Sequence, residues 1–132
     1  MKFVADTNIL FSFFWKNSVT YKLLLKLEVY SPEYALEEIK KYEKEIIKKT
    51  GLSKKEFNEL RKELVIAVDF IPIGDYKSKL KEALKICLDE NDIDFFSLCL
   101  KLNLPLWSND KLLKNQKKII VLNTYNVLER IS

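Results

Sequence analysis

Five short apolar segments recur along the chain, and amphipathic helical patterns fill the intervals between them. The segments are KFVA (2–5), EVYS (28–31), VDFIPI (68–73), LPLW (104–107) and KIIVL (118–122). Alternation of strands and helices is typical of a parallel sheet that carries helices on both faces. We therefore predict one doubly wound α/β domain over residues 1–132, built on a five-stranded, mainly parallel twisted sheet.

The interval between the second and third segments is long enough for two helices, and we predict a helical hairpin at about residues 32–65. Pro32 suits the first position of the first helix, because its fixed φ fits there and its missing N–H costs nothing. Gly51 then breaks the pattern. Ser53 and Glu56 have the spacing of a capping box, which predicts the start of the second helix.

Composition narrows the chemistry further. The 132 residues include no histidine, which excludes Ser-His and Cys-His nucleophile pairs and leaves no tetrahedral zinc set. The two cysteines, Cys87 and Cys99, lie inside apolar helical patterns and are expected to be small buried hydrophobes. The chain has neither a leader-like segment nor a membrane-length apolar run, so we expect a cytoplasmic protein with no membrane association.

The formal net charge is +4, and lysines are unevenly distributed. Three clusters contain Lys40, Lys41, Lys44, Lys48 and Lys49; Lys54, Lys55, Arg61 and Lys62; and Lys111, Lys114, Lys117 and Lys118. Such clusters are usually solvated helix faces, and that is the preferred interpretation of each one alone. A basic protein is also biased toward polyanions, so nucleic acid stays a candidate partner.

Helical periodicity separates inward carboxylates from solvated ones. In PEYALEEIKKYEKEII, Glu37 falls opposite the apolar stripe, whereas Glu38 lies at its border. In NDIDFFSLCLKLN, Asp92 shares its side with Phe96 and Cys99, whereas Asp94 lies on a polar strip with Ser97 and Lys101. We expect Asp94 to act as a first-turn acid that completes a helix cap with Asn91.

Asp6 and Asp110 each follow an apolar segment, and ligands of open α/β sheets bind beyond the carboxyl ends of the strands. Each acid also has a structural interpretation. Asp6 and Asp110 can be helix N-caps, Glu38 can pair with a lysine, and Asp92 can be a first-turn acid. Taken together, the four carboxylates are better explained by one pocket around a cation, and oxygen ligands of this kind suit Mg²⁺ or Mn²⁺.

Three stretches, VADTNIL, SPEYALEEIKKY and NDIDFFSLCLKLNLPLWSNDK, give the chain a resemblance to the PIN-domain ribonucleases over nearly its whole length. The resemblance implies a three-layer α/β/α sandwich. It also implies that Asp6, Glu38, Asp92 and Asp110 form a catalytic quartet around one or two Mg²⁺ or Mn²⁺ ions. Two further residues, Asn8 and Ser108, match the polar groups that support such a site by hydrogen bonding.

By the same resemblance the chain is a metal-dependent endoribonuclease. Metal-activated water would hydrolyse RNA phosphodiester bonds and leave 5′-phosphate and 3′-hydroxyl ends. Asp6, Asp92 and Asp110 would hold the metal, and Glu38 would bind through water or orient the nucleophile. Lysines around the pocket would contact the RNA backbone without reading sequence.

Two stretches depart from the family pattern. Ser97-Leu98-Cys99 replaces a run of small residues and preserves their size, whereas residues 50–64 are lysine-rich and less family-like.

The nuclease is either a toxin inhibited by an antitoxin protein that covers the acidic pocket, or an RNA-processing factor.

We expect a homodimer. An aromatic run, made up of Phe11, Phe13, Phe14 and Trp15, is one source of a dimer surface. Core packing is its preferred interpretation.

Three other functions compete with the nuclease. A phosphatase of the haloacid-dehalogenase type needs a second acid two residues after Asp6, and Asn8 occupies that place. A receiver-type signalling domain needs a lysine after a late strand, but KIIVL has its lysine at the opposite end. The third alternative, a non-catalytic PIN-like RNA-binding or scaffold protein, is weakened by inward carboxylates that are costly without a metal.

Overall fold

A five-stranded sheet forms the centre of the protein in a computed structural model that describes residues 1–131. The strands are β1 (Lys2–Ala5), β2 (Glu28–Pro32), β3 (Val68–Ile71), β4 (Leu106–Trp107) and β5 (Val121–Leu122). Their order is β3-β2-β1-β4-β5, and every recorded pairing is parallel, which confirms the predicted parallel sheet. This order makes β1 and β4 neighbours where the strand order changes direction, and such switch points are where ligands bind in α/β sheets.

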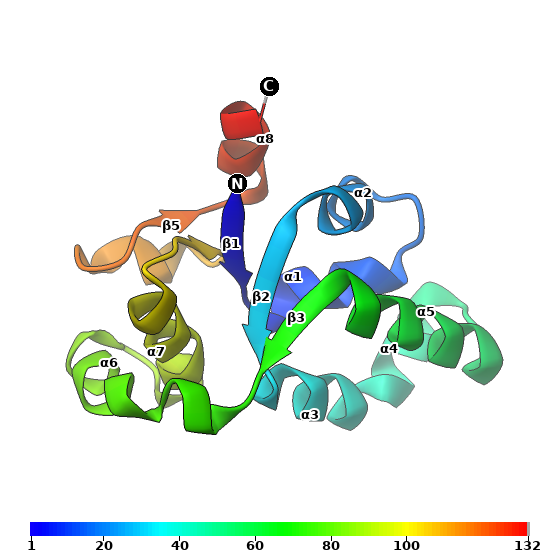
Figure 1. Cartoon of the computed structure of the whole chain (residues 1–132). Coiled ribbons are helices and arrows are strands. Elements are labelled where there is room, and N and C mark those ends of the chain that lie inside the picture. Colours follow the sequence, from blue (N-terminus) through cyan, green and yellow to red (C-terminus); the bar gives the residue numbers. More distant parts are fainter. Residues whose placement is uncertain (132) are drawn as a thin grey trace.

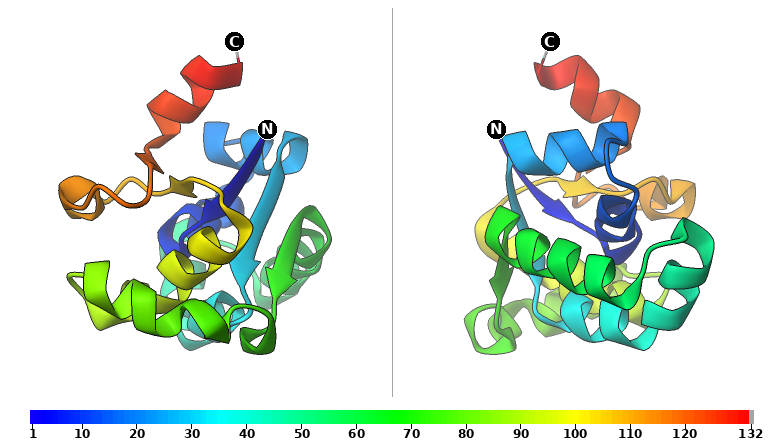
Figure 2. Two further views of the ribbon diagram at one scale, coloured as in Figure 1. Left: turned by 60° about the vertical axis from the view of Figure 1, so that its left-hand side comes forward. Right: turned by 90° about the vertical axis from the view of Figure 1, so that its right-hand side faces the viewer.

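Helices cover both faces of the sheet and complete the predicted three layers (Figure 1). The α-helices are α1 (Thr7–Phe11), α2 (Val19–Lys26), α3 (Tyr34–Lys41), α4 (Glu43–Thr50), α5 (Lys54–Ala67), α6 (Leu80–Ile86), α7 (Ile93–Leu102) and α8 (Thr124–Ile131). The 3₁₀ turns are η1 (Ser12–Phe14), η2 (Ile73–Asp75), η3 (Lys77–Lys79), η4 (Glu90–Asp92) and η5 (Lys111–Asn115). Helix α7 packs on β1, β2 and β4, and α5 lies across the opposite face (Figure 2). Over residues 1–131, no helix has both the length and the apolar character needed to cross a membrane.

The last three strands are shorter than predicted. Strand β3 ends at Ile71 because Pro72 has no N–H to donate, and Ile73 already begins η2. Strands β4 and β5 have two residues each, and Leu106 pairs with Val4 on one side and Val121 on the other. Leu104 instead caps α7, because its N–H donates to the carbonyl of Cys99.

Three helices rather than two fill the interval between β2 and β3. Pro32 ends β2 instead of starting a helix, because Glu33 N still donates across to Ile71 O. Tyr42, with φ −99° and ψ 12°, separates α3 from α4. The signals that follow are confirmed: Gly51 ends α4 at φ +75°, and Ser53 starts α5 in a full capping box.

Aromatic residues early in the chain belong mainly to the core. Phe14 stacks on Phe57 with ring centroids 4.6 Å apart, and Phe13 packs on Tyr21 at 4.7 Å. Both residues are fully buried, which confirms the core-packing interpretation for them. Trp15 differs, since 41% of it is exposed.

Helix α7 is the most buried helix over the sheet. Cys99 is buried in it as predicted, whereas Cys87 is half-buried and lies just beyond the end of α6 rather than inside a helix. The predicted polar strip on α7 is wrong at Ser97, which is fully buried. Its hydroxyl donates to the carbonyl of Ile93 at 2.7 Å, which satisfies the polar group inside the core.

Candidate active site

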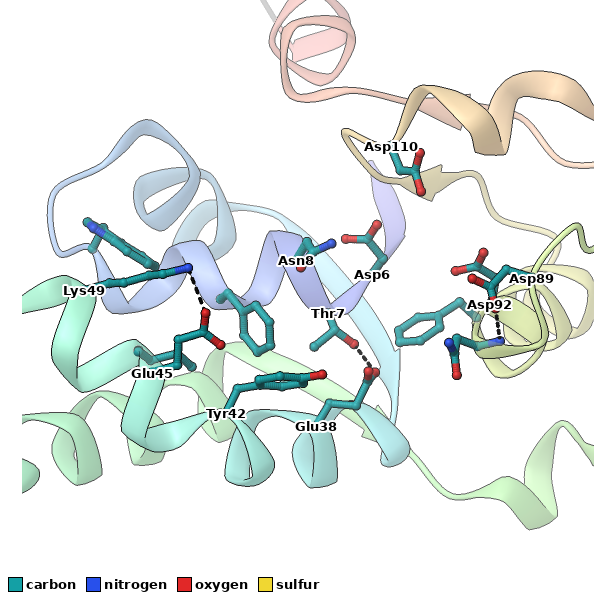
Figure 3. Close-up of a pocket in the computed structure, with 15 residues that line it drawn as sticks. Asp6, Thr7, Asn8, Glu38, Tyr42, Glu45, Lys49, Asp89, Asp92 and Asp110 are labelled. Carbon is teal, nitrogen blue, oxygen red and sulfur yellow. Dashed lines mark hydrogen bonds and ion pairs between the residues drawn. The ribbon is translucent and has the colours of Figure 1, made fainter.

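Four carboxylates from four separate segments line one cavity of about 450 Å³ beyond the carboxyl ends of β1 and β4 (Figure 3). Asp6 follows β1, Glu38 lies on α3, Asp92 ends η4, and Asp110 follows β4. These are the four acids that the sequence placed together, and we call their cavity the acidic cavity.

Asp6 is held at the junction of two neighbouring strands. Its backbone N–H donates to Trp107 O at 3.1 Å, which continues the pairing of β1 with β4. Its side chain caps α1 by accepting from Ile9 N at 2.9 Å, and the residue is only 8% exposed. The N-cap interpretation is therefore correct, and the same carboxylate also lines the cavity. Asn8 lines the cavity as well, but no side-chain hydrogen bond to an acid is recorded for it within residues 1–131.

Asp110 occupies the matching position after β4. Its side chain caps η5 by accepting from Leu112 N at 3.0 Å, while its own N–H donates to Ser108 Oγ at 3.1 Å. Ser108 is buried, and its N–H donates to Leu122 O on β5. Ser108 therefore fixes the loop that presents Asp110.

Glu38 is fixed by a contact that sequence reasoning missed. Thr7, the middle residue of Asp-Thr-Asn, donates its hydroxyl to Glu38 Oε1 at 2.5 Å, as Figure 3 shows. As the helical pattern predicted, Glu37 is exposed and Glu38 is half-buried. Thr7 is buried and lies directly after Asp6, so one short segment orients two of the four acids.

The η4 turn contributes two carboxylates rather than one. Asp92 lines the cavity, and so does Asp89, whose side chain accepts from Asn91 N at 2.9 Å. The cap predicted between Asn91 and Asp94 is therefore wrong, because Asp89 caps this turn. Asp94 instead accepts from the Tyr76 hydroxyl at 2.5 Å and is not among the residues that line the acidic cavity. Asp89 was missed because a 3₁₀ turn, not an α-helix, precedes Ile93.

Burial and mutual repulsion raise the pKa of two of these acids. Desolvation raises the pKa of Asp6 from 3.8 to about 6, hydrogen bonds from Ser108 and Ile9 oppose the shift, and repulsion from Asp110 and Glu38 adds to it. The pKa of Asp92 also rises to about 6, first through desolvation and then through repulsion by Asp89. Carboxylates in such surroundings favour a bound cation or a proton.

The donor set fits a hard divalent cation. All of its ligand atoms are carboxylate oxygens, and the chain contains no histidine. Within residues 1–131, however, no group of three or more acids, histidines or cysteines is placed so that it could hold a metal ion. Mg²⁺ usually takes only one or two carboxylates and completes its shell with water and substrate phosphate, so it does not require three protein ligands.

The rest of the acidic cavity forms an aromatic arm between α1 and α4. Phe11 meets the Tyr42 ring edge-on, with centroids 5.8 Å apart, and Trp15 also lines the cavity. Lys49 is the one cation among the described lining residues, and it pairs with Glu45 at 3.0 Å. The cavity is therefore strongly negative, with apolar rings beside the acids.

Comparison with known families agrees with this geometry. Residues 4–122 match the sequence profile of the PIN domain. The chain belongs to the PIN domain family. PIN domains form a nuclease family whose members are generally ribonucleases and generally use divalent metal ions.

A solved structure shares the fold of this PIN domain. It is described as VapBC2 from Rickettsia felis bound to a DNA fragment from their promoter. The TM-score is 0.62 at 18% sequence identity, and the match covers 93% of this chain and 98% of the other. At this identity the similarity establishes the fold. A search of curated protein sequences finds no significant match.

Proposed function

We propose that this PIN domain is a divalent-metal-dependent endoribonuclease whose site is the acidic cavity. The observation that carries the proposal is the convergence of Asp6, Glu38, Asp92 and Asp110 from separate segments at the junction of β1 and β4. If Asp6 and Asp110 served only as helix caps, that role would not explain why other acids lie beside them. The raised pKa values of Asp6 and Asp92 add a free-energy cost that a cation would offset.

Each acid has a distinct part in the proposed site. Asp6 and Asp110 are each oriented by a helix-cap hydrogen bond, so they define where one or two Mg²⁺ or Mn²⁺ ions bind. Asp92 lines the same cavity from η4 and would act through an intervening water, because no three acids within residues 1–131 are placed to bind one ion directly. Glu38, oriented by Thr7, lies beside them and accepts a proton or positions water. The ion itself would neutralise phosphodiester charge and activate water.

Neutralising single acids tests this proposal. Purified protein is incubated with end-labelled single-stranded RNA in Mn²⁺, in Mg²⁺ and in excess chelator, beside Asp6→Asn and Asp92→Asn. The matched controls are Glu37→Gln and Asp94→Asn, which lie one or two residues from cavity acids but do not line the cavity. We expect metal-dependent cleavage that both cavity variants lose and both controls keep. Equal cleavage by all five proteins would identify a contaminant and refute the assignment.

We further propose a toxin role in which an antitoxin protein covers the acidic cavity. The support is the shared fold with a VapBC2 chain, whose description includes a partner and promoter DNA. Expression of the wild type should slow bacterial growth, and Asp6→Asn should not. If a co-expressed protein from the neighbouring gene fails to restore growth and to bind the chain, the role is RNA processing instead.

We also propose a homodimer, as the sequence suggested, although Phe13 and Phe14 of the aromatic run take no part in it. Phe13 and Phe14 are buried within one chain, and Trp15 lines the acidic cavity. Phe13 and Phe14 therefore contribute nothing to a dimer surface, whereas Trp15 is 41% exposed. Light scattering after size-exclusion chromatography distinguishes a dimer from a monomer.

A further inference from the structure

A second cavity, of about 290 Å³, adjoins the acidic cavity. Asp110 lines both, so the two cavities share this residue. The second cavity lies between η5 and the start of α8, and Lys111, Lys114 and Tyr125 contribute side chains to it. We call it the basic cavity.

The walls of the basic cavity are held by hydrogen bonds. Asn109 Oδ1 accepts from both the N–H and the hydroxyl of Thr124, at 2.9 and 3.2 Å. Asn123 and Asn126 cap each other, with N–H to Oδ1 distances of 2.7 and 3.1 Å. The loop after β4 is thus tied to the start of α8, and the cavity is formed before any ligand binds.

Charge distinguishes the two cavities. The acidic cavity has six carboxylates in its described lining, so the backbone of RNA is repelled from most of it. Asp110 is the one carboxylate recorded in the lining of the basic cavity, which also contains two lysines. Lys114 donates to Asn126 Oδ1 at 3.2 Å, and within residues 1–131 neither lysine is recorded in an ion pair. Both ammonium groups are available to an anion.

Tyr125 provides an aromatic surface beside these lysines. Tyr125 lies in the first turn of α8 and is 68% exposed, whereas Val127 of the same helix is fully buried. An exposed ring next to cations is the combination that binds single strands, because unpaired bases stack on the ring while cations follow the phosphates. A duplex presents no unstacked base to such a ring.

We propose that the basic cavity binds one nucleotide of single-stranded RNA next to the scissile phosphodiester. Lys111 and Lys114 hold its phosphate, and Tyr125 stacks on its base. The adjoining backbone then passes Asp110 and reaches the acidic cavity. This inference rests on the proposed ribonuclease function, since it assigns the substrate path of that site.

Binding without cleavage tests the inference. Fluorescence anisotropy in excess chelator measures a fluorescein-labelled oligouridylate on the wild type, Tyr125→Ala, Tyr125→Phe and the double variant Lys111→Ala/Lys114→Ala. We expect Tyr125→Ala to weaken binding by about tenfold and Tyr125→Phe to retain it. The double lysine variant should reduce the slope of log affinity against log salt by about 0.7, because the two lysines hold one phosphate and each phosphate contact on a single strand contributes about 0.7.

The control removes the same charge elsewhere. Lys81→Ala/Lys85→Ala changes two exposed lysines of α6 that line neither cavity. If this control weakens binding as much as Lys111→Ala/Lys114→Ala, general basicity explains the affinity and the inference is overturned. Equal binding of a blunt RNA duplex, or no binding of the oligouridylate, overturns it too.

Cleavage in Mn²⁺ is measured separately on the same proteins. Tyrosine- and lysine-dependent binding without cleavage would uphold the nucleotide site and refute the nuclease. Cleavage with binding that is unchanged in all variants would uphold the nuclease and refute the nucleotide site.

Discussion

Replacing Asp6 by Asn removes one charge from the acidic cavity and nearly preserves the shape of the side chain. Asn caps helices about as well as Asp, and its Oδ1 can still accept from Ile9 N. The substitution therefore tests the free-energy cost of the buried charge separately from the helix cap.

The magnitude follows from the pKa of Asp6, which folding raises from 3.8 to about 6, mainly through desolvation. Between these two values the folded state binds more protons than the unfolded state, so the free energy of unfolding falls as pH rises. Below about 3.8 both states are protonated and the cost is absent; above about 6 it is complete. A shift of this size corresponds to about 3 kcal/mol of lost stability at neutral pH.

Urea unfolding in excess chelator measures this cost. We expect Asp6→Asn to be more stable than the wild type by up to about 3 kcal/mol at neutral pH, with the difference shrinking toward zero as the pH approaches 3.8. Glu37→Gln, which neutralises an exposed acid on α3, should stay within about 0.5 kcal/mol of the wild type.

Added Mn²⁺ should remove most of this difference in stability. A ligand that binds only the folded state stabilises it by about 2.7 kcal/mol at a hundredfold excess over its Kd. The wild type should gain this stabilisation, and Asp6→Asn should gain far less. An Asp6→Asn protein that is less stable than the wild type in chelator at neutral pH would refute the burial argument. Equal stabilisation of both proteins by Mn²⁺ would show that the metal does not bind at Asp6.

Substitutions at three further positions test Glu38 and the boundary between α4 and α5. Glu38→Gln should lower the rate of RNA cleavage by about ten- to a hundredfold, whereas Glu37→Gln should leave it unchanged. Equal cleavage rates of the two variants would show that Glu38 takes no part in the reaction. Ser53→Ala should lower the free energy of unfolding by about 1 kcal/mol in urea titrations, because it removes the capping box of α5; an unchanged midpoint would contradict this. Gly51→Ala should cost about 1 kcal/mol through its φ of +75° alone, since no atom lies within 4 Å of the added Cβ, and Gly51→Asn should cost less.

Local signals predicted much of the fold. The five apolar segments became five parallel strands, and Gly51 and Ser53 mark the α4–α5 boundary as expected. Errors occurred where long-range pairing overrode local preference. Pro32 suits a helix start, but pairing of β2 with β3 keeps it in the strand. Tyr42 interrupts a helical pattern that carries no breaker, so no residue signalled α4.

The candidate site was also predicted only in part. Helical periodicity alone distinguished Glu38 from Glu37, because the direction of a side chain on a helix depends only on its position in the turn. Assignment of the four acids to metal binding and catalysis remains a prediction. Thr7 was missed because its importance depends on Glu38, which lies far away in the chain, and no local pattern records that pairing. Asp89 was missed because the segment before Ile93 is a 3₁₀ turn and not an α-helix.

The sequence by itself determined the alternation of strands and helices, the principal helix boundaries and the inward carboxylates, since all of these depend on residues close together in the chain. Tertiary structure decided which segments became neighbours. The order β3-β2-β1-β4-β5 placed Asp6 beside Asp110 and set the basic cavity against the acidic one. Such neighbours are fixed by the crossover connections and by packing of the whole core, which act over distances that no sequence period spans.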